Sequence, residues 1–267
     1  MSDPVEILAA DGAFARIHPR GAHLTYWQPA GCAESRLFLS EHAIYAEGIP
    51  IRGGVPVIFP QFASEGPLPK HGFARTASWH LLRSGNGEAV FSWQDDAATR
   101  VHWPHSFAAT LTVQIGGNAL TVRLGIRNTG EASFPFTAAL HTYLAVDDIA
   151  AVRLSGLRGC RYCDTAGGGA LCTDADEAVA VAGEVDRNYF ATPGVLMLRD
   201  GRRETRIEQQ GFADTVVWNP GAATSAQFKD LAPDAYRRFL CVEAAVIEHP
   251  IWLAPGAEWQ GQQRLTA

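Results

Sequence analysis

The sequence has no long hydrophobic run and no excess of basic residues. None of its 267 residues lie in a stretch approaching the roughly 20 apolar residues that a membrane-spanning helix needs. The N-terminus, MSDPVEILAADGAF, lacks the basic patch and apolar core of a secretory signal peptide. The formal net charge is -6, which gives no general attraction to nucleic acid or to anionic membranes. A negatively charged ligand therefore has to be captured by a local cluster of cations.

Cysteine is scarce and irregularly spaced. The chain holds Cys32, Cys160, Cys163, Cys172 and Cys241. An odd number of cysteines in a chain of this length is a poor disulfide framework, so we expect a protein of the reducing cytoplasm. Cys160 and Cys163 form a C-x-x-C pair, but no second pair follows at zinc-finger spacing, which favours burial over metal binding or redox chemistry.

Helical periodicity is also nearly absent, and alternation with a period of two residues dominates. Residues 111–115 and 120–126 alternate apolar and polar types on either side of Gly116-Gly117-Asn118, which predicts a β-hairpin with one buried face. A second hairpin is predicted around the turn Asp200-Gly201. Its strands and the further short runs with strand composition are Val195–Leu198, Thr205–Gln209, Ala89–Trp93, Val152–Leu154, Thr215–Trp218 and Phe239–Val246.

Many short strands with few helices predict an all-β fold, a single β-sandwich domain spanning residues 1–267. The one helical stretch of note is short, near Asp234–Arg238. Glycine and proline are scattered along the chain rather than gathered in a linker. The loop Gly48–Arg75 is rich in both, and loops held by a rigid β scaffold commonly carry binding groups.

Two segments of this loop concentrate cations. Arg52 precedes Gly53-Gly54, which allow a sharp backbone turn, and Lys70, His71 and Arg75 lie within six residues of one another. Arginine offers bidentate donors and lysine a point charge, so the set suits a phosphate group. From the residues alone, these cations could equally pair with surface carboxylates.

Two ionisable residues lie in apolar, strand-like runs. Glu243 is the only charge in LCVEAAV, and burying a carboxylate is costly without partners. Carboxylates in such places have raised pKa values, as general bases require. His141 lies in LHTYLAV. Taken alone, it could be a hydrogen-bonded core histidine, and Glu243 could be a strand-end partner of an arginine.

A set of motifs resembles the glucose-6-phosphate 1-epimerases, a branch of the aldose 1-epimerase superfamily. They follow the order typical of that family from about Ile49 to the C-terminus: IRGGVPVIFPQF, KHGFARTASWHL, LHTYLAV, EVDRNYF, DTVVWNP, FLCVE and LAPGAEWQGQQRL. The resemblance implies a galactose-mutarotase-like β-supersandwich with few short helices and an open sugar-binding cleft.

The resemblance also implies roles for individual residues. His141 matches the catalytic histidine of the family and Glu243 its catalytic glutamate. Residues expected to bind the sugar phosphate are Arg52, His71, Arg75 and, through sugar hydroxyls, Asp186. Lys70 departs from the family pattern, which has glutamine before this His-Gly, and an added cation there bears on phosphate binding and on the choice of hexose. Asp214 could support the site or simply begin a strand.

The implied reaction interconverts the α and β anomers of a hexose 6-phosphate, with glucose 6-phosphate the expected substrate. Glu243 would act as base on the anomeric hydroxyl and His141 as acid on the ring oxygen. This chemistry requires no metal and no cofactor. We expect a small-molecule sugar phosphate as the only partner, neither nucleic acid nor membrane, and a monomer.

Three alternatives remain at this stage. A non-catalytic carbohydrate-binding β-sandwich would use tryptophans that stack on sugars. A glycoside hydrolase would use two carboxylates, whereas this chain pairs a histidine with a glutamate. A metal-dependent sugar isomerase would need a histidine cluster, and the only close pairs are His102 with His105 and His18 with His23.

Overall fold

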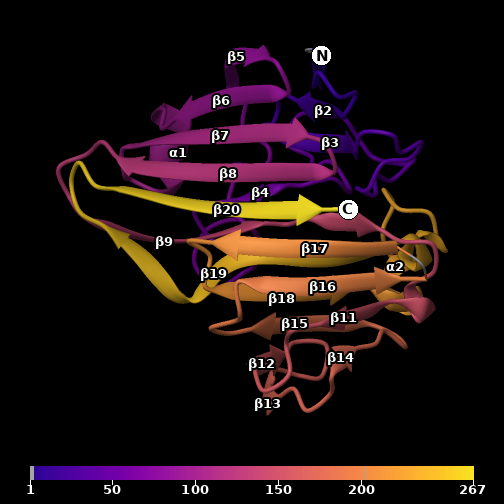
Figure 1. Ribbon diagram of the computed structural model, residues 1–267. Helices are drawn as coiled ribbons and strands as arrows, with labels where there is room; N and C mark the ends of the chain where they lie inside the picture. Colours follow the sequence, from indigo (N-terminus) through magenta and orange to yellow (C-terminus); the bar gives the residue numbers. More distant parts are fainter. Residues whose placement is uncertain (1–2, 202) are drawn as a thin grey trace.

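Three antiparallel sheets make up most of the structure, a computed structural model that describes residues 3–201 and 203–267. The largest sheet is formed by β5 (His80–Gly85), β6 (Glu88–Gln94), β7 (Phe107–Gly116), β8 (Ala119–Asn128), β11 (Arg153–Ser155), β14 (Ala178–Val179), β16 (Val195–Asp200), β17 (Arg203–Gln210) and β20 (Glu258–Thr266). Its nine strands lie in the order β14-β11-β16-β17-β20-β8-β7-β6-β5. In Figure 1 this sheet faces the viewer.

An eight-stranded sheet lies behind it (Figure 1). It is formed by β4 (Val57–Ile58), β9 (Phe134–Leu140), β10 (Tyr143–Ala145), β12 (Arg161–Asp164), β13 (Ala170–Thr173), β15 (Val185–Tyr189), β18 (Asp214–Asn219) and β19 (Phe239–Leu253). The order is β13-β12-β15-β18-β19-β9-β4, and β10 pairs with β19 beside this path. The N-terminal strands β1 (Val5–Leu8), β2 (Phe14–His18) and β3 (His23–Gln28) form a small sheet of their own.

Side-chain alternation explains why the two large sheets pack together. Along β7, every second residue from Phe107 to Ile115 is buried, so one face of the strand is apolar. The buried residues of β7 and β8 join those of β9, β18 and β19 in one continuous core. Each sheet hides its apolar face against the other, which is the packing of a β-sandwich.

Strand β19 differs because nine consecutive residues, Phe239 to Ile247, are buried on both faces. The even-numbered residues of this run, Leu240 to Val246, enter the core between the sheets. The odd-numbered ones lie on the opposite face, which loops and the β10 segment cover. A second buried layer therefore exists outside the sandwich, and Glu243 lies in it.

The predicted strands are confirmed, including both hairpins, although β19 continues to Leu253. The expected helical stretch is a 3₁₀ turn, η2 (Ala235–Arg238), and another lies at η1 (Ile149–Ala151). Two helices were not predicted, α1 (Ala97–His102) and α2 (Gly221–Ser225).

Helix α1 escapes prediction because it buries no residue and so shows no amphipathic pattern. A reciprocal cap between Asp96 and Thr99 holds its first turn. No helix in the described ranges is long and apolar enough to cross a membrane.

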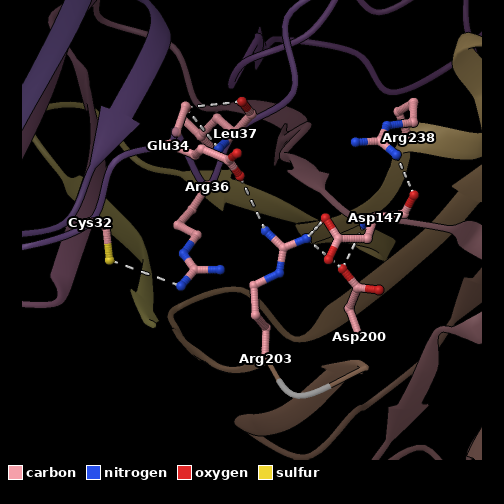
Figure 2. Close-up of polar contacts among 9 residues, drawn as sticks. Cys32, Glu34, Arg36, Leu37, Asp147, Asp200, Arg203 and Arg238 are labelled. Carbon is pink, nitrogen blue, oxygen red and sulfur yellow. Dashed lines mark hydrogen bonds and ion pairs between the residues drawn. The ribbon is translucent and has the colours of Figure 1, made fainter.

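An ion-pair network fixes the chain just after β10 (Figure 2). The Arg203 guanidinium contacts the carboxylates of Asp147 and Asp200, the latter at 3.0 Å, and Glu34 at 3.8 Å. The Asp147 amide also donates to Asp200, at 2.7 Å, and Arg238 donates to the Asp147 carbonyl. The network ties the β16–β17 hairpin to the loop that follows β10.

Replacing Arg203 with alanine is expected to lower the free energy of unfolding by about 1–3 kcal/mol. The reason is that Asp200, whose side chain is only 7% exposed, loses its cationic partner. Urea denaturation measures the change. The control is Arg199→Ala, which removes a partner from the 47%-exposed Glu204 and should cost under about 0.5 kcal/mol. Equal losses in the two variants would contradict the prediction.

Candidate active site

A cleft of about 410 Å³ opens on the outer face of the eight-stranded sheet. Its wall contains every residue predicted from the sequence to bind or react with substrate: Arg52, Lys70, His71, Arg75, His141, Asp186 and Glu243. A larger hollow of about 890 Å³ lies over β5–β7 beside α1, but it contains none of them. Two of its acidic residues already have partners: Asp95 is bonded to the Phe107 amide and to Arg100, and Asp96 caps α1. The smaller cleft is therefore the candidate site.

Strand register brings residues from three segments of the chain onto one wall of the cleft. Asp186 of β15 pairs with Trp218 of β18, which in turn pairs with Cys241 of β19. Two residues along, the next row consists of Asn188, Val216 and Glu243. Because residues i and i+2 of a strand share a face, both rows point into the cleft.

His141 and Glu243 form a buried pair at the centre of this wall. The His141 Nε2 atom lies 3.2 Å from Glu243 Oε1, and the two residues are 8% and 1% exposed. The remaining polar atoms, His141 Nδ1 and Glu243 Oε2, are buried and have no hydrogen-bond partner among the described residues. Buried polar atoms without partners are rare in native proteins, and they point to a group that a ligand completes.

Burial suppresses the charge on both members of the pair. Burial and the nearby Asp186 raise the pKa of Glu243 well above its usual range. Burial, together with His71, Arg75 and Arg52, lowers the pKa of His141 well below its usual value. Both shifts disfavour an ion pair in the ligand-free cleft and favour a neutral histidine beside a protonated glutamate.

His71 is a neutral hydrogen-bond donor in the same cleft. Its Nδ1 accepts from the Ala63 amide at 3.3 Å, so the ring proton is on Nε2. Burial and the charge of Arg75 lower the pKa of His71 to about 3. Its backbone has a φ of +68°, a left-handed conformation that is strained for a residue other than glycine. Its ring meets His141 edge to face, with centroids 5.7 Å apart.

Two glycines aim Arg52 into the cleft. Gly53 and Gly54 have φ values of +108° and +63°. A Cβ at Gly53 would lie 2.5 Å from the Phe38 carbonyl oxygen, and one at Gly54 would collide with the carbonyl of Leu24. No other residue type fits this turn.

Three side chains hold the Arg52 guanidinium in place. Its Nε lies 3.2 Å from an Asp230 oxygen, Nη1 donates to the Tyr143 hydroxyl at 3.3 Å, and the Phe228 ring centroid is 4.4 Å away. The group is therefore fixed before any ligand arrives, and its remaining N–H donors are available to an anion.

Arg75 and Lys70 complete the cationic end of the cleft. Arg75 Nη2 donates to the Lys70 carbonyl at 2.8 Å, and neither side chain has a carboxylate ion-pair partner among the described residues. Burial and the charge of Arg52 lower the pKa of Arg75 to about 10, and the group stays charged at neutral pH. Of these three cations only Arg52 has an ion-pair partner among the described residues, so the cluster can form an anion site.

Asp186 and Asp214 have different surroundings. Asp186 faces the cleft, where burial raises its pKa and Lys70 opposes the shift. Asp214 is 2% exposed and accepts from the amides of Ala191, Ile247 and Glu248 at 2.8–3.1 Å. It thereby anchors β19 where the register shifts, so it is a structural residue.

The sequence analysis did not single out four groups that the structure places in this cleft. They are Tyr143, Asn188, Phe228 and Asp230. Asn188 could have been found, because it follows Asp186 by two residues in a strand. Asp230 lies in a loop without any periodic pattern, and only the tertiary structure brings it to Arg52. No group of three or more potential metal ligands occurs among residues 3–201 and 203–267.

A family model described as aldose 1-epimerase matches residues 5–266. A proposed glucose-6-phosphate 1-epimerase of Cenchrus ciliaris is 34% identical over 99% of this chain and 84% of its own length. A protein of the same description from Escherichia coli K12 is 37% identical over 85% of this chain and 77% of its length. The crystal structure of a proposed mutarotase from Salmonella typhimurium superposes with a TM-score of 0.87 at 30% identity, covering 95% of this chain and 86% of that one.

Glu243→Gln is expected to stabilise the protein at alkaline pH. Glu243 ionises near its ordinary pKa in the unfolded chain but only at higher pH in the fold, so its contribution to stability is lost as the pH rises, by up to about 1.4 kcal/mol per pH unit. Glutamine does not titrate. Urea denaturation should therefore show a gain over the wild type that grows between about pH 5 and pH 8.

The matched control for this measurement is the exposed Glu131, replaced by glutamine. The unfolding free energy of the Glu131→Gln variant should equal that of the wild type at every pH. A gain for Glu243→Gln that is equal at both ends of the pH range would mean that the buried carboxyl is not protonated in the fold.

Proposed function

The chain belongs to the aldose 1-epimerase family, and on this basis we propose that it interconverts the α and β anomers of a hexose 6-phosphate, with glucose 6-phosphate as the preferred substrate. One observation carries the proposal. A cluster of Arg52, Lys70 and Arg75, suited to a phosphate, shares its cleft with the buried His141–Glu243 pair, suited to proton transfer. The names of the relatives in Cenchrus ciliaris and Escherichia coli support the same substrate.

The proposed reaction is a reversible ring opening. Glu243 as carboxylate removes the proton from the anomeric hydroxyl, and the C1–O bond becomes the carbonyl of the aldehyde. The bond between C1 and the ring oxygen breaks, and His141 as imidazolium gives its proton to that oxygen. Rotation about C1–C2 presents the other face of the carbonyl, and the reverse transfers close the ring. Ring closure returns the proton to each side chain, so Glu243 ends the cycle as carboxylate and His141 as imidazolium.

The substrate's phosphate has a second task in this mechanism. In the ligand-free cleft burial lowers the pKa of His141, and the charges of Arg75 and Arg52 add to this shift. A phosphate dianion on these arginines offsets their charge, so the proton shared with Glu243 can move to His141. The substrate thus brings the pair into the protonation state that the reaction needs.

His71 and Asp186 are proposed to hold the sugar between the two ends of the cleft. The Nε2–H of His71 offers a neutral donor next to His141. Asp186 offers acceptors for hydroxyl groups, and its charge is balanced in part by Lys70. Holding the sugar in a reactive orientation lowers the entropic part of the activation barrier.

A non-catalytic sugar-binding role is not supported. Membership in an enzyme family argues against it, and so does the cost of burying a histidine and a glutamate with unpaired atoms. We further propose that the chain acts as one β-sandwich domain, as a cytoplasmic monomer without a cofactor, and without nucleic-acid or membrane partners.

Anomer exchange observed by two-dimensional NMR tests the reaction. The protein should accelerate the exchange of α and β glucose 6-phosphate above its spontaneous rate, and Glu243→Gln should lower the catalysed rate by about 10²–10⁴-fold. The control is Glu131→Gln. Glu131 is exposed and does not line the cleft, so this variant should keep full activity. Undiminished exchange by Glu243→Gln would exclude Glu243 as the base.

Inorganic phosphate should activate the protein toward unphosphorylated glucose. Free glucose leaves the arginines uncompensated, so its exchange should be slow in kcat as well as weak in binding. Millimolar phosphate should raise kcat for glucose, because it restores the charge balance around His141. Arg75→Gln should abolish this activation and lower kcat/KM for glucose 6-phosphate by about 10–100-fold. Activation that survives in Arg75→Gln would place the phosphate elsewhere.

A further inference from the structure

We infer that Asn188 hydrogen-bonds a ring hydroxyl of the sugar on its anomeric side, at C2 or C3, and so helps to determine which hexose 6-phosphate the protein accepts. The inference rests on the proposed function and assigns a residue that the family resemblance did not. Asn188 lines the cleft from β15, two residues after Asp186.

The side chain of Asn188 is buried without any hydrogen bond. The residue is 8% exposed, and its Oδ1 has no partner among the described residues. It shares this property with two other residues of the cleft, His141 and Glu243. A carbonyl oxygen in such a place loses its bonds to water and gains nothing in return, unless a ligand supplies them.

The other buried side-chain amides show that this chain normally satisfies such groups. Asn128 donates to two carbonyls and accepts from the Gly130 amide. Asn219 likewise donates to two carbonyls and accepts from the Gly221 amide. Gln61 and Gln263 are likewise bonded at both ends. Asn188 is the exception among the buried amides of the described residues, and it is the one that faces the cleft.

Strand register places Asn188 level with the reacting groups rather than with the phosphate end. Tyr143, whose hydroxyl contacts Arg52, pairs with Cys241 in the row that also contains Asp186. Asn188 lies in the next row, with Glu243. The backbones of Asn188 and Glu243 are two strand spacings apart, about 9.6 Å. This distance leaves room for a pyranose ring between their side chains.

The chemistry of the amide suits a hydroxyl group. A sugar hydroxyl both donates and accepts, and a carboxamide offers an acceptor oxygen and a donor nitrogen side by side. A site built to bond a hydroxyl discriminates against a sugar that lacks it, because its own buried groups are then left unpaired. Asn188 carries no charge, so this selection adds nothing to the electrostatic balance of the His141–Glu243 pair.

The test compares wild type with Asn188→Leu, which keeps the size and removes the polar atoms. Exchange kinetics are measured by NMR for glucose 6-phosphate and for its 2-deoxy, 3-deoxy and 4-deoxy analogues. Asn188→Leu should lower kcat/KM for glucose 6-phosphate by about 10–100-fold. It should change the rate far less for the analogue that lacks the recognised hydroxyl, at C2 or C3. The exposed Asn118, replaced by leucine, should leave all four rates unchanged.

Each outcome separates the two proposals. An unchanged rate in Asn188→Leu, or an equal loss with all four sugars, would overturn the assignment and leave the proposed function standing. An interaction confined to the 4-deoxy analogue would place the side chain at the wrong end of the ring and overturn it as well. If the wild-type protein exchanges none of the four sugars, the proposed function is wrong and the role of Asn188 falls with it.

Discussion

The arrangement of the cleft depends on one costly contact, the burial of the Glu243 carboxyl against the His141 imidazole. Neither group can hold a charge easily at that depth, and each keeps one polar atom unpaired. A fold selected only for stability would place apolar residues there. In the proposed mechanism the surrounding cations make this contact reactive, because an anionic ligand bound to them favours a proton on His141.

The outer face of the eight-stranded sheet makes this contact possible. In β19, even-numbered residues such as Val242 build the core of the sandwich, while odd-numbered ones such as Glu243 face a second layer of loops. The carboxyl therefore sits on a strand held rigidly from behind. Reactive groups on such a strand keep their geometry better than groups carried by a loop. The loop Gly48–Arg75 contributes the cations.

Much of the fold and the site could be predicted from the sequence, for identifiable reasons. Period-two alternation in residues 111–115 and 120–126 specifies a hairpin with one buried face, and the isolated charge of Glu243 in an apolar run marks it as unusual. The resemblance to a family supplied the pairing with His141. The helix α1 could not be predicted, because an exposed helix shows no periodic pattern of apolar residues. The Arg52–Asp230 pair could not be predicted either, because only the tertiary structure brings the loop residue Asp230 to Arg52.

The Arg52–Asp230 pair also bears on why the cationic end uses three positive groups. Asp230 fixes the direction of Arg52 but cancels part of its charge, so Arg52 alone would attract a phosphate weakly. Arg75 and Lys70 have no such carboxylate among the described residues and restore the positive potential. Orientation and attraction are thus divided between different residues. This division is compatible with Lys70 at the position where the resemblance implies glutamine: a third cation strengthens attraction without disturbing the geometry that Arg52 sets.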